Sequence, residues 1–220
     1  MGESIASEKA PGKKRRIKDS EEQKKPALRI SHIVYGREKL RSRVVYLVDP
    51  TGAGDEKKIA EQVVLYRWRR RTFPGHSFAG GRLNPGLWRT AQDVFGGDPA
   101  TWVTLSELKI QYKVHACRES LSERRETLPS AQVLRALFEY CGPTRLQAIL
   151  ARHTDPERLN RFGTPDLFLY AINNESKKVS IARFVEVKKP EEQLSQDQKE
   201  EIRFLQSLDL HARVLRLIER

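Results

Sequence analysis

Three ionisable residues near the C-terminal end of the chain have the side-chain types and the spacing that suit the binding of a cation. Asp166 ends the stretch GTPD, and Glu186 and Lys188 lie in the largely apolar run RFVEVKKP. A carboxylate or ammonium group removed from water is costly unless another group pairs with it. The acid and the base in this run therefore need a partner, which is either a bound cation or another side chain.

A β-hairpin would bring the two acids together. The segments GTPDLFLYAI and VSIARFVEVKK have the composition of strands, and the polar stretch NNESKK separates them. With the turn centred near Ser176, Asp166 lies opposite Glu186, and directly opposed Cβ atoms are roughly 4.5–5.5 Å apart. Because side chains alternate along a strand, Glu186 and Lys188 share one face and the neighbouring valines share the other.

Two carboxylates this close repel one another unless a cation lies between them or one is protonated. Asp166, Glu186 and the backbone carbonyl of Val187 are oxygen ligands of the kind that Mg²⁺ prefers. Lys188 would then orient or deprotonate a metal-bound water and stabilise charge on a phosphate. The alternative is structural: an ion pair of Lys188 with Asp166 or Glu186 at the edge of the sheet.

The surrounding elements predict an α/β fold with a mixed sheet. Two helices come before the hairpin, and a helix capped by Ser195 and a closing strand HARVLRLI follow it. We expect a disordered basic tail over 1–26 and a mostly helical, less regular, basic region over 27–123. The Gly- and Pro-rich stretch TFPGHSFAGGRLNPG is expected to be a loop. The core is expected over 124–220.

The charge of the chain favours a polyanionic partner, nucleic acid before membrane. The formal net charge is +12, and residues 1–71 hold 19 Lys and Arg against 10 Asp and Glu. The tail carries PGKKRRIK, which is a nuclear import signal if the protein is eukaryotic or, alternatively, a nonspecific phosphate-binding segment; otherwise we expect a cytoplasmic protein. No run is long and apolar enough for a membrane span, and the two cysteines have no zinc-site spacing.

The arrangement Pro165-Asp166 followed by Glu186-Val187-Lys188 matches the signature of the PD-(D/E)XK nuclease superfamily. Its flanks, GTPDLFLY and FVEVKKPEEQLSQDQ, resemble the VRR-NUC domain, and CGPTRLQAILARHTDPERLNRFGTPDL is most similar to the Fanconi-associated nuclease branch. The resemblance covers roughly residues 130–220. It implies a restriction-endonuclease-like core and Mg²⁺- or Mn²⁺-dependent cleavage of flap or branched DNA. It also implies that Asp166, Glu186 and the Val187 carbonyl are ligands and that Lys188 is catalytic.

Further residues enter through this resemblance. Glu61, in IAEQVVLYRWRR, matches a helix glutamate of the metal site, or it is an exposed helix carboxylate. Gln198 matches the family's helix glutamine, or it only completes a capping box with Ser195. The family stretch G-x-H-x-E-G reads GHSFAGG here, with His76 present and Phe78 or Ala79 at the acidic position.

Four arginines near the end of the helix that carries Glu61 suit both its C-terminal dipole and a phosphate backbone. They are Arg67, Arg69, Arg70 and Arg71. Two functions therefore stay open: an active metal-dependent, structure-selective DNA nuclease of repair or replication, and a weakly active or inactive DNA-binding scaffold. An RNA-binding role is disfavoured, because no RNA-recognition aromatic motif is present. Protein partners are not predicted.

Overall fold

The structure is a computed structural model that describes residues 28–40, 43–47, 57–95, 131–155 and 163–219. Its elements in chain order are β1 (Ile30–Leu40), β2 (Arg43–Leu47), β3 (Lys57–Lys58), α1 (Ala60–Arg69), β4 (His76–Arg82), α2 (Pro85–Phe95), α4 (Ala131–Thr154), β5 (Leu167–Asn173), β6 (Val179–Lys188), α5 (Gln196–Ser207) and β7 (Ala212–Glu219). The basic tail lies outside the described residues, and so does the helical turn DPERLNRF except for its first residue.

One mixed sheet organises the described part of the chain. Its strand order is β3-β2-β1-β7-β6-β5-β4. The pairs β1–β7 and β6–β7 are parallel, whereas the other neighbouring strands are antiparallel. The α/β fold with a mixed sheet is therefore confirmed.

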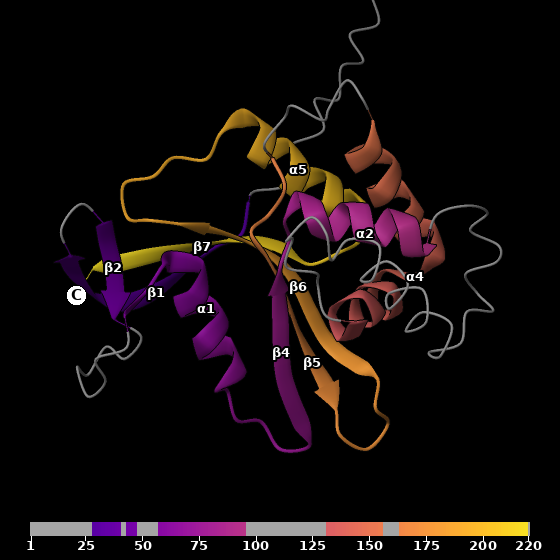
Figure 1. Cartoon of the computed structure of the whole chain (residues 1–220), viewed down its shortest axis with the longest axis horizontal. Helices are drawn as coiled ribbons and strands as arrows, with labels where there is room; N and C mark the ends of the chain where they lie inside the picture. Colours follow the sequence, from indigo (N-terminus) through magenta and orange to yellow (C-terminus); the bar gives the residue numbers. More distant parts are fainter. Residues whose placement is uncertain (1–27, 41–42, 48–56, 96–130, 156–162, 220) are drawn as a thin grey trace, which may run out of the picture.

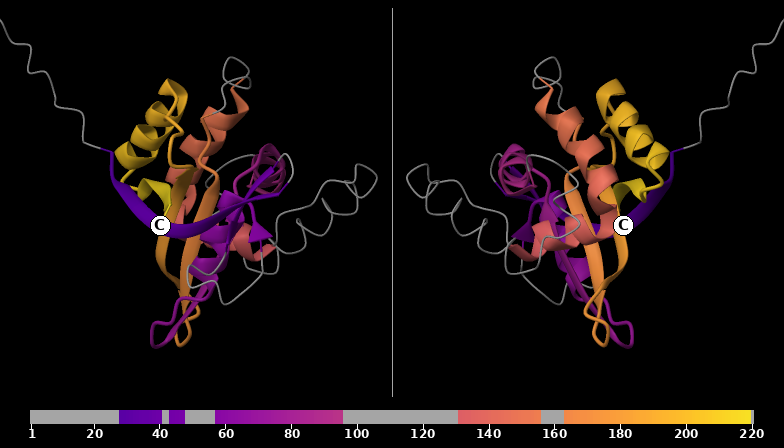
Figure 2. Two further views of the ribbon diagram at one scale, coloured as in Figure 1. Left: turned by 90° about the vertical axis from the view of Figure 1, so that its left-hand side faces the viewer. Right: turned by 90° about the vertical axis from the view of Figure 1, so that its right-hand side faces the viewer.

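Helices cover both faces of the sheet, as Figures 1 and 2 show from three sides. Helices α2, α4 and α5 pack on one face against Phe168, Tyr170 and Phe184. Helix α1 packs on the other face against Leu169 and Val185. Because both faces are buried, β5 is almost continuously apolar, and the second half of β6 is buried throughout although it carries Glu186 and Lys188. No helix in the described part of the chain is long and apolar enough to cross a membrane.

The hairpin β5–β6 has the predicted register. Leu167 pairs with Val185 and Phe168 with Phe184, so Asp166 and Glu186 are the next opposed residues beyond the ladder. The turn is stabilised by Asn173, whose Oδ1 accepts the backbone N–H groups of Glu175 and Ser176 at 3.0 and 2.9 Å. The register shifts only between Ala171 and Ile172, at the turn end of the hairpin.

The helices also end where local sequence predicts. The two predicted helices before the hairpin form α4, which is broken at Gly142, where φ is 70°. Glycine tolerates this left-handed conformation, and Pro143 directly after it prevents the helix from continuing undisturbed. Helix α5 starts at the predicted cap, Ser195.

The expectation of a mostly helical region over 27–123 is wrong for its described residues. They contain four strands and two helices, and β1 and β4 belong to the same sheet as the hairpin. The sheet therefore extends across the boundary expected between 27–123 and 124–220. The physical reason is that β1 is held extended by parallel pairing with β7, which is far away in the sequence and leaves no local signal.

The stretch expected to be a loop contains strand β4, and this is a second correction. Gly80 lies opposite Leu169 in the ladder. A Cβ atom at Gly80 would lie 2.8 Å from the backbone oxygen of Phe168 and 3.0 Å from a methyl group of Leu65. Glycine here serves close packing between β5 and α1 rather than a turn.

Candidate active site

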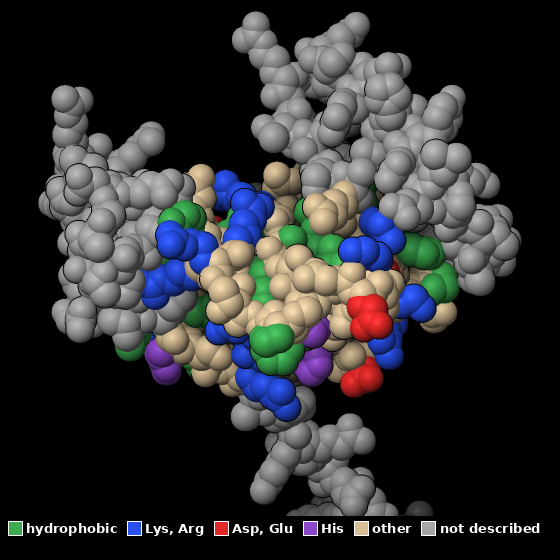
Figure 3. All heavy atoms as spheres, turned by 90° about the horizontal axis from the view of Figure 1, so that it is seen from below, with side chains coloured by type: hydrophobic (Ala, Val, Ile, Leu, Met, Phe, Trp, Pro, Cys, Tyr) green, Lys and Arg blue, Asp and Glu red, His purple; other side chains and the backbone are tan. Residues whose placement is uncertain are grey.

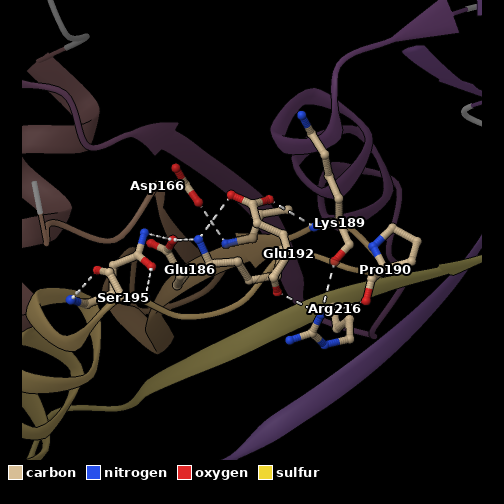
Figure 4. A network of polar contacts seen from close by, with 10 residues as sticks. Asp166, Glu186, Lys189, Pro190, Glu192, Ser195 and Arg216 are labelled. Atoms are coloured by element: carbon tan, nitrogen blue, oxygen red, sulfur yellow. Dashed lines mark hydrogen bonds and ion pairs between the residues drawn. The ribbon is translucent and has the colours of Figure 1, made fainter.

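The predicted acids and the lysine converge at one end of the hairpin. Asp166 immediately precedes β5, and Glu186 and Lys188 lie at the end of β6. Asp166 is fixed by its own backbone carbonyl, which accepts the N–H of Leu83 at 2.8 Å, and by its Oδ2 atom, which accepts the N–H of Val187 at 2.7 Å. Figure 4 shows Asp166 and Glu186 beside one another at this end of the sheet.

Glu186 is the most buried acid of the site, with 2% of its surface exposed. Its Oε1 atom accepts a hydrogen bond from Nε2 of Gln198 at 2.6 Å and lies 3.0 Å from Nζ of Lys188. Its Oε2 atom is also buried and has no hydrogen-bond partner among the described residues. One oxygen is thus held in place, whereas the other is oriented but unsatisfied.

Both acids have a raised pKa. Burial, followed by the charge of Asp166, raises the pKa of Glu186 to about 7. Burial is also the main cause of the raised pKa of Asp166, and the charge of Glu61 adds to it, against the lowering effect of the Val187 N–H. Both shifts mean that negative charge at this position lacks full compensation, which a bound cation would supply.

Lys188 is enclosed by acids. Only 3% of its surface is exposed, and its Nζ atom lies 3.0 Å from Oε1 of Glu186 and 3.2 Å from Oε1 of Glu192. Burial alone would lower the pKa of Lys188, but the hydrogen bonds and charges of the two glutamates outweigh it and raise the pKa. Lys188 is therefore a cation at neutral pH, which suits stabilisation of a negative charge better than removal of a proton.

The donor set fits a small divalent cation. The unsatisfied Glu186 oxygen, Asp166 and the Val187 carbonyl predicted from sequence are all hard oxygen ligands. Within the described ranges, no three His, Cys, Asp or Glu side chains are grouped so that they could hold a metal by themselves. The carboxylate pair would therefore need the carbonyl and water molecules to complete a coordination shell, which is how Mg²⁺ is usually bound.

Glu61 approaches this site from the opposite face of the sheet. It lies half-buried in the first turn of α1, and its charge is close enough to raise the pKa of Asp166. It is not fully exposed, as the structural alternative required, and it does not close a cluster of three acids either. Its role as a metal ligand stays a prediction.

Gln198 makes both of the contacts that the sequence left as alternatives. Its backbone N–H donates to Oγ of Ser195 at 3.2 Å, and its Oε1 atom accepts the Ser195 N–H at 3.0 Å, which completes a capping box. Its Nε2 atom still donates to Glu186. One side chain thus anchors the start of α5 and orients the buried acid.

The four predicted DNA-binding arginines lie away from the carboxylates. Glu61 is in the first turn of α1, and along the helix axis Arg67 is about 9 Å and Arg69 about 12 Å away from it, with Arg70 and Arg71 beyond the last helical residue. Arg69 donates from Nη2 to the Gly80 carbonyl at 2.9 Å, and Arg70 lies over the ring of Tyr66. The guanidinium of Arg71 is 5.1 Å from the ring of Trp68. Arg67 is half-buried, unlike the other three.

Sequence reasoning did not identify Arg183 as a companion of these arginines. Its guanidinium is 4.8 Å from the ring of Trp68, so Arg71 and Arg183 share one indole. Burial, followed by the charges of Arg213 and Arg71, lowers the pKa of Arg183 to about 10, which leaves it charged at neutral pH. The sequence holds only a weak signal for this role: Arg183 lies two residues before Val185 in β6, which places both on the face that α1 covers.

A buried ion-pair cluster that sequence reasoning also missed holds α5 against α4. Glu201 accepts a hydrogen bond at its Oε2 atom from Nε of Arg152 at 2.6 Å, and its Oε1 atom is 3.3 Å from Nε2 of His153. The ring of His153 in turn stacks on Trp88, with 4.5 Å between centroids. Because Glu201 follows Gln198 by three residues on α5, this cluster helps to fix the helix that orients Glu186.

The sheet topology, with acids at one end of the β5–β6 hairpin and a lysine beside them, defines a PD-(D/E)XK-like α/β core. The VRR-NUC domain model matches residues 106–217. The chain therefore belongs to the VRR-NUC family, and the resemblance seen in the sequence is confirmed.

A solved structure supports the same fold. A crystal structure of paFAN1 bound to DNA with a two-nucleotide 5′ flap and a gap matches with a TM-score of 0.53 and 15% identity, over 89% of this chain and 38% of that chain. A second paFAN1 structure, with a one-nucleotide 5′ flap, matches over the same shares at 15% identity with a TM-score of 0.49. This chain thus spans well under half the length of the paFAN1 chain. Among curated proteins, none matches.

Proposed function

We propose that this protein is a metal-dependent nuclease that hydrolyses phosphodiester bonds in DNA, with Mg²⁺ or Mn²⁺ as its cofactor. The observation that carries the proposal is the buried pair Asp166 and Glu186 with an unsatisfied Glu186 oxygen and a charged lysine alongside. An ion pair alone explains Lys188, but it leaves that oxygen and the repulsion between the two acids unexplained.

Each residue has a separate task in this proposal. The divalent cation, when bound, polarises the phosphate and lowers the pKa of its bound water. Asp166 and Glu186 hold the site's negative charge in a fixed geometry, and Gln198 keeps the Glu186 carboxylate oriented. The ammonium group of Lys188 stabilises negative charge that builds on the phosphate oxygens. The raised pKa of Lys188 argues against its acting as the base.

DNA as the substrate is supported by the charge of the molecule. Lys and Arg side chains are spread over the face seen in Figure 3, whereas the acidic side chains in that view gather at one edge. The paFAN1 structures contain DNA with a 5′ flap and a gap, and this is why we propose flap or branched DNA rather than plain duplex. The exposed Arg70 and Arg71, which lie over the rings of Tyr66 and Trp68, would contact the phosphate backbone.

The missing acidic residue in GHSFAGG favours the alternative function, a DNA-binding scaffold with little catalysis. The position of that stretch in the fold weakens this argument against catalysis. His76 pairs with Asn173 at the turn end of the hairpin, whereas the carboxylate pair lies at the opposite end, where Arg82 pairs with Leu167. Phe78 instead packs edge-on against Trp68, with 5.0 Å between centroids. The departure from the family pattern therefore changes packing under α1 rather than the contacts of Asp166 and Glu186.

A cleavage assay tests the proposed function. Labelled 5′ flaps, 3′ flaps, three-way junctions, duplex and single strands of the same sequence would be incubated with Mg²⁺, Mn²⁺, Ca²⁺ or a chelator. We expect cleavage with Mg²⁺ or Mn²⁺, a preference for a flap, and none with the chelator. Binding without cleavage under every condition would support the scaffold instead.

We also propose nuclear localisation if the host is a eukaryote, on the basis of the KKRRIK cluster in the tail. A fluorescent fusion should lose nuclear enrichment when Lys13, Lys14, Arg15 and Arg16 are changed to Ala. Enrichment that persists would contradict the signal and favour a phosphate-binding tail.

A further inference from the structure

A short turn follows Lys188 and brings a third glutamate to the site. The backbone N–H of Glu192 donates to the carbonyl of Lys189 at 3.2 Å. Pro190 occupies the second position of this four-residue turn, where its fixed φ is favourable. The sequence K-P-E-E thus reverses the chain directly after β6 and returns Glu192 to the side chain of Lys188.

Glu192 uses its two carboxylate oxygens for two different contacts. Oε1 lies 3.2 Å from Nζ of Lys188, and Oε2 accepts the backbone N–H of Lys189 at 3.3 Å. Figure 4 shows Glu192 beside Asp166 and Glu186, while the side chain of Lys189 extends away from them. The side chain of Glu192 is nevertheless 46% exposed, so its carboxylate could be solvated by water without Lys188 as a partner.

Arg216 holds this turn from the neighbouring strand. It is the register partner of Lys188 in the parallel ladder between β6 and β7. Its Nη1 atom lies within hydrogen-bonding distance of three carbonyl oxygens of the turn: Lys189 at 3.1 Å, Pro190 at 2.8 Å and Glu192 at 2.9 Å. A charged guanidinium that binds several carbonyls of one turn leaves that turn little freedom to move.

We propose that Arg216 and Glu192 are positioning residues for Lys188. Arg216 fixes the turn, the turn fixes Glu192, and Glu192 holds the ammonium group of Lys188 together with Glu186. A flexible lysine side chain would otherwise adopt many rotamers, and a misplaced charge stabilises a transition state poorly. The effect on cleavage rests on the proposed nuclease function, whereas the effect on the lysine itself does not.

Kinetics of three variants test the route from Arg216 to Lys188. They are Glu192→Gln, Arg216→Gln and the double variant, and Glu191→Gln is the matched control because Glu191 is an exposed acid in the same turn. Glutamine has one acceptor oxygen, so Glu192→Gln cannot make both contacts of the carboxylate. We expect kcat to fall about tenfold in each single variant while KM stays within about twofold.

The double variant distinguishes a shared route from two separate contributions. If Arg216 acts through Glu192, the double variant is no slower than the slower single variant, because the same contact is lost in both. Multiplied losses, or an equal loss in Glu191→Gln, would overturn the inference. Thermal melting of each variant verifies that it is folded.

A measurement that does not depend on cleavage separates the inference from the proposed function. The amine of Lys188 would be acylated with a small ester, and its labelling rate relative to Lys189 would be read by mass spectrometry. We expect Glu192→Gln and Arg216→Gln to raise this ratio several-fold, and Glu191→Gln to leave it unchanged. If the wild type cleaves no DNA but the two variants still show these labelling changes, the nuclease proposal is refuted and the positioning role is kept. An unchanged ratio in Glu192→Gln would refute the positioning role.

Discussion

The two faces of strand β6 are built from alternate residues of the same short run, yet one face is apolar packing and the other carries the charged residues of the candidate site. Val185 and Val187 point to the face under α1, where they pack in an apolar cluster. Glu186 and Lys188 point to the other face and are equally buried, but one carboxylate oxygen of Glu186 has no hydrogen-bond partner among the described residues. Burial is the same on both faces, so burial alone does not reveal function.

The difference lies in what compensates each side chain. An apolar side chain gains free energy from burial itself, whereas a buried carboxylate loses free energy unless a hydrogen bond or a charge replaces water. On the face under α1 the indole of Trp68 has such compensation, since its Nε1 atom donates to the carbonyls of Ala79 and Tyr170 at 2.8 and 3.0 Å. The other face keeps an unsatisfied carboxylate oxygen and a raised pKa, both of Glu186. Such uncompensated charge is typical of functional sites.

The largest effect is expected on the face that carries the acids. Asp166→Asn and Glu186→Gln should each slow cleavage by about a thousandfold or more, corresponding to about 4 kcal/mol in the barrier. Single-turnover cleavage at saturating DNA measures this, and Glu175→Gln, in the turn at the other end of the hairpin, is the control. Neither variant should unfold, because each removes one of two repelling charges. The ion-pair alternative predicts instead that the melting temperature of the wild type does not change with Mg²⁺ and that both variants are destabilised.

The pH dependence of stability should come from the same face. The pKa of Glu186 is about 7 in the fold, against an ordinary value of 4.5. Between these two values the folded state binds more protons than the unfolded state, so the free energy of unfolding falls as pH rises, by up to about 3 kcal/mol. Urea unfolding at pH 5 and pH 8 without metal measures this. Glu186→Gln should flatten the dependence, and Mg²⁺ should recover stability at pH 8; a dependence that the variant retains would assign it to other groups.

The face under α1 should respond to shape instead of charge. Gly80→Ala should destabilise the protein by about 1–3 kcal/mol, because its Cβ would meet a backbone oxygen that cannot move aside. Gly81→Ala is the comparison, since its Cβ would meet the side chain of Val133 at 2.9 Å, which has more freedom to shift. Chemical denaturation measures both. Equal losses of stability in the two variants would show that the close approach of β4 to the β5 backbone at Gly80 constrains the fold no more than the contact of Gly81 with Val133.

The smallest effect concerns the arginines on Trp68. Arg71→Gln and Arg183→Gln should each reduce the slope of log affinity against log salt by about 0.9 if each neutralises one DNA phosphate. Fluorescence anisotropy with a labelled flap and the inactive Asp166→Asn background measures the slope. Arg145→Gln is the control, because Arg145 pairs with Asp209 at 3.6 Å. An unchanged slope would show that this face does not touch DNA.

Sequence reasoning worked best where local rules fix the structure. The register of β5 and β6 follows from a short turn and a period of two, so it placed Asp166 opposite Glu186 correctly. The start of α5 at Ser195 followed from a capping box. Sequence reasoning failed for β1 and β4, because their extended conformation depends on partners distant in the sequence.

The amino-acid sequence alone identifies the acids and the lysine, predicts their pairing in one hairpin, and carries the excess of positive charge. Three further features follow from tertiary packing: Gln198 reaches Glu186, Glu61 lies near Asp166 from the other face, and Arg216 holds the turn beside Lys188. The reason is physical. Alternation and capping act between neighbours in the chain, whereas these contacts exist because a parallel strand and two helices are packed against the hairpin by burial of apolar surface, which has no direction that a local pattern could reveal.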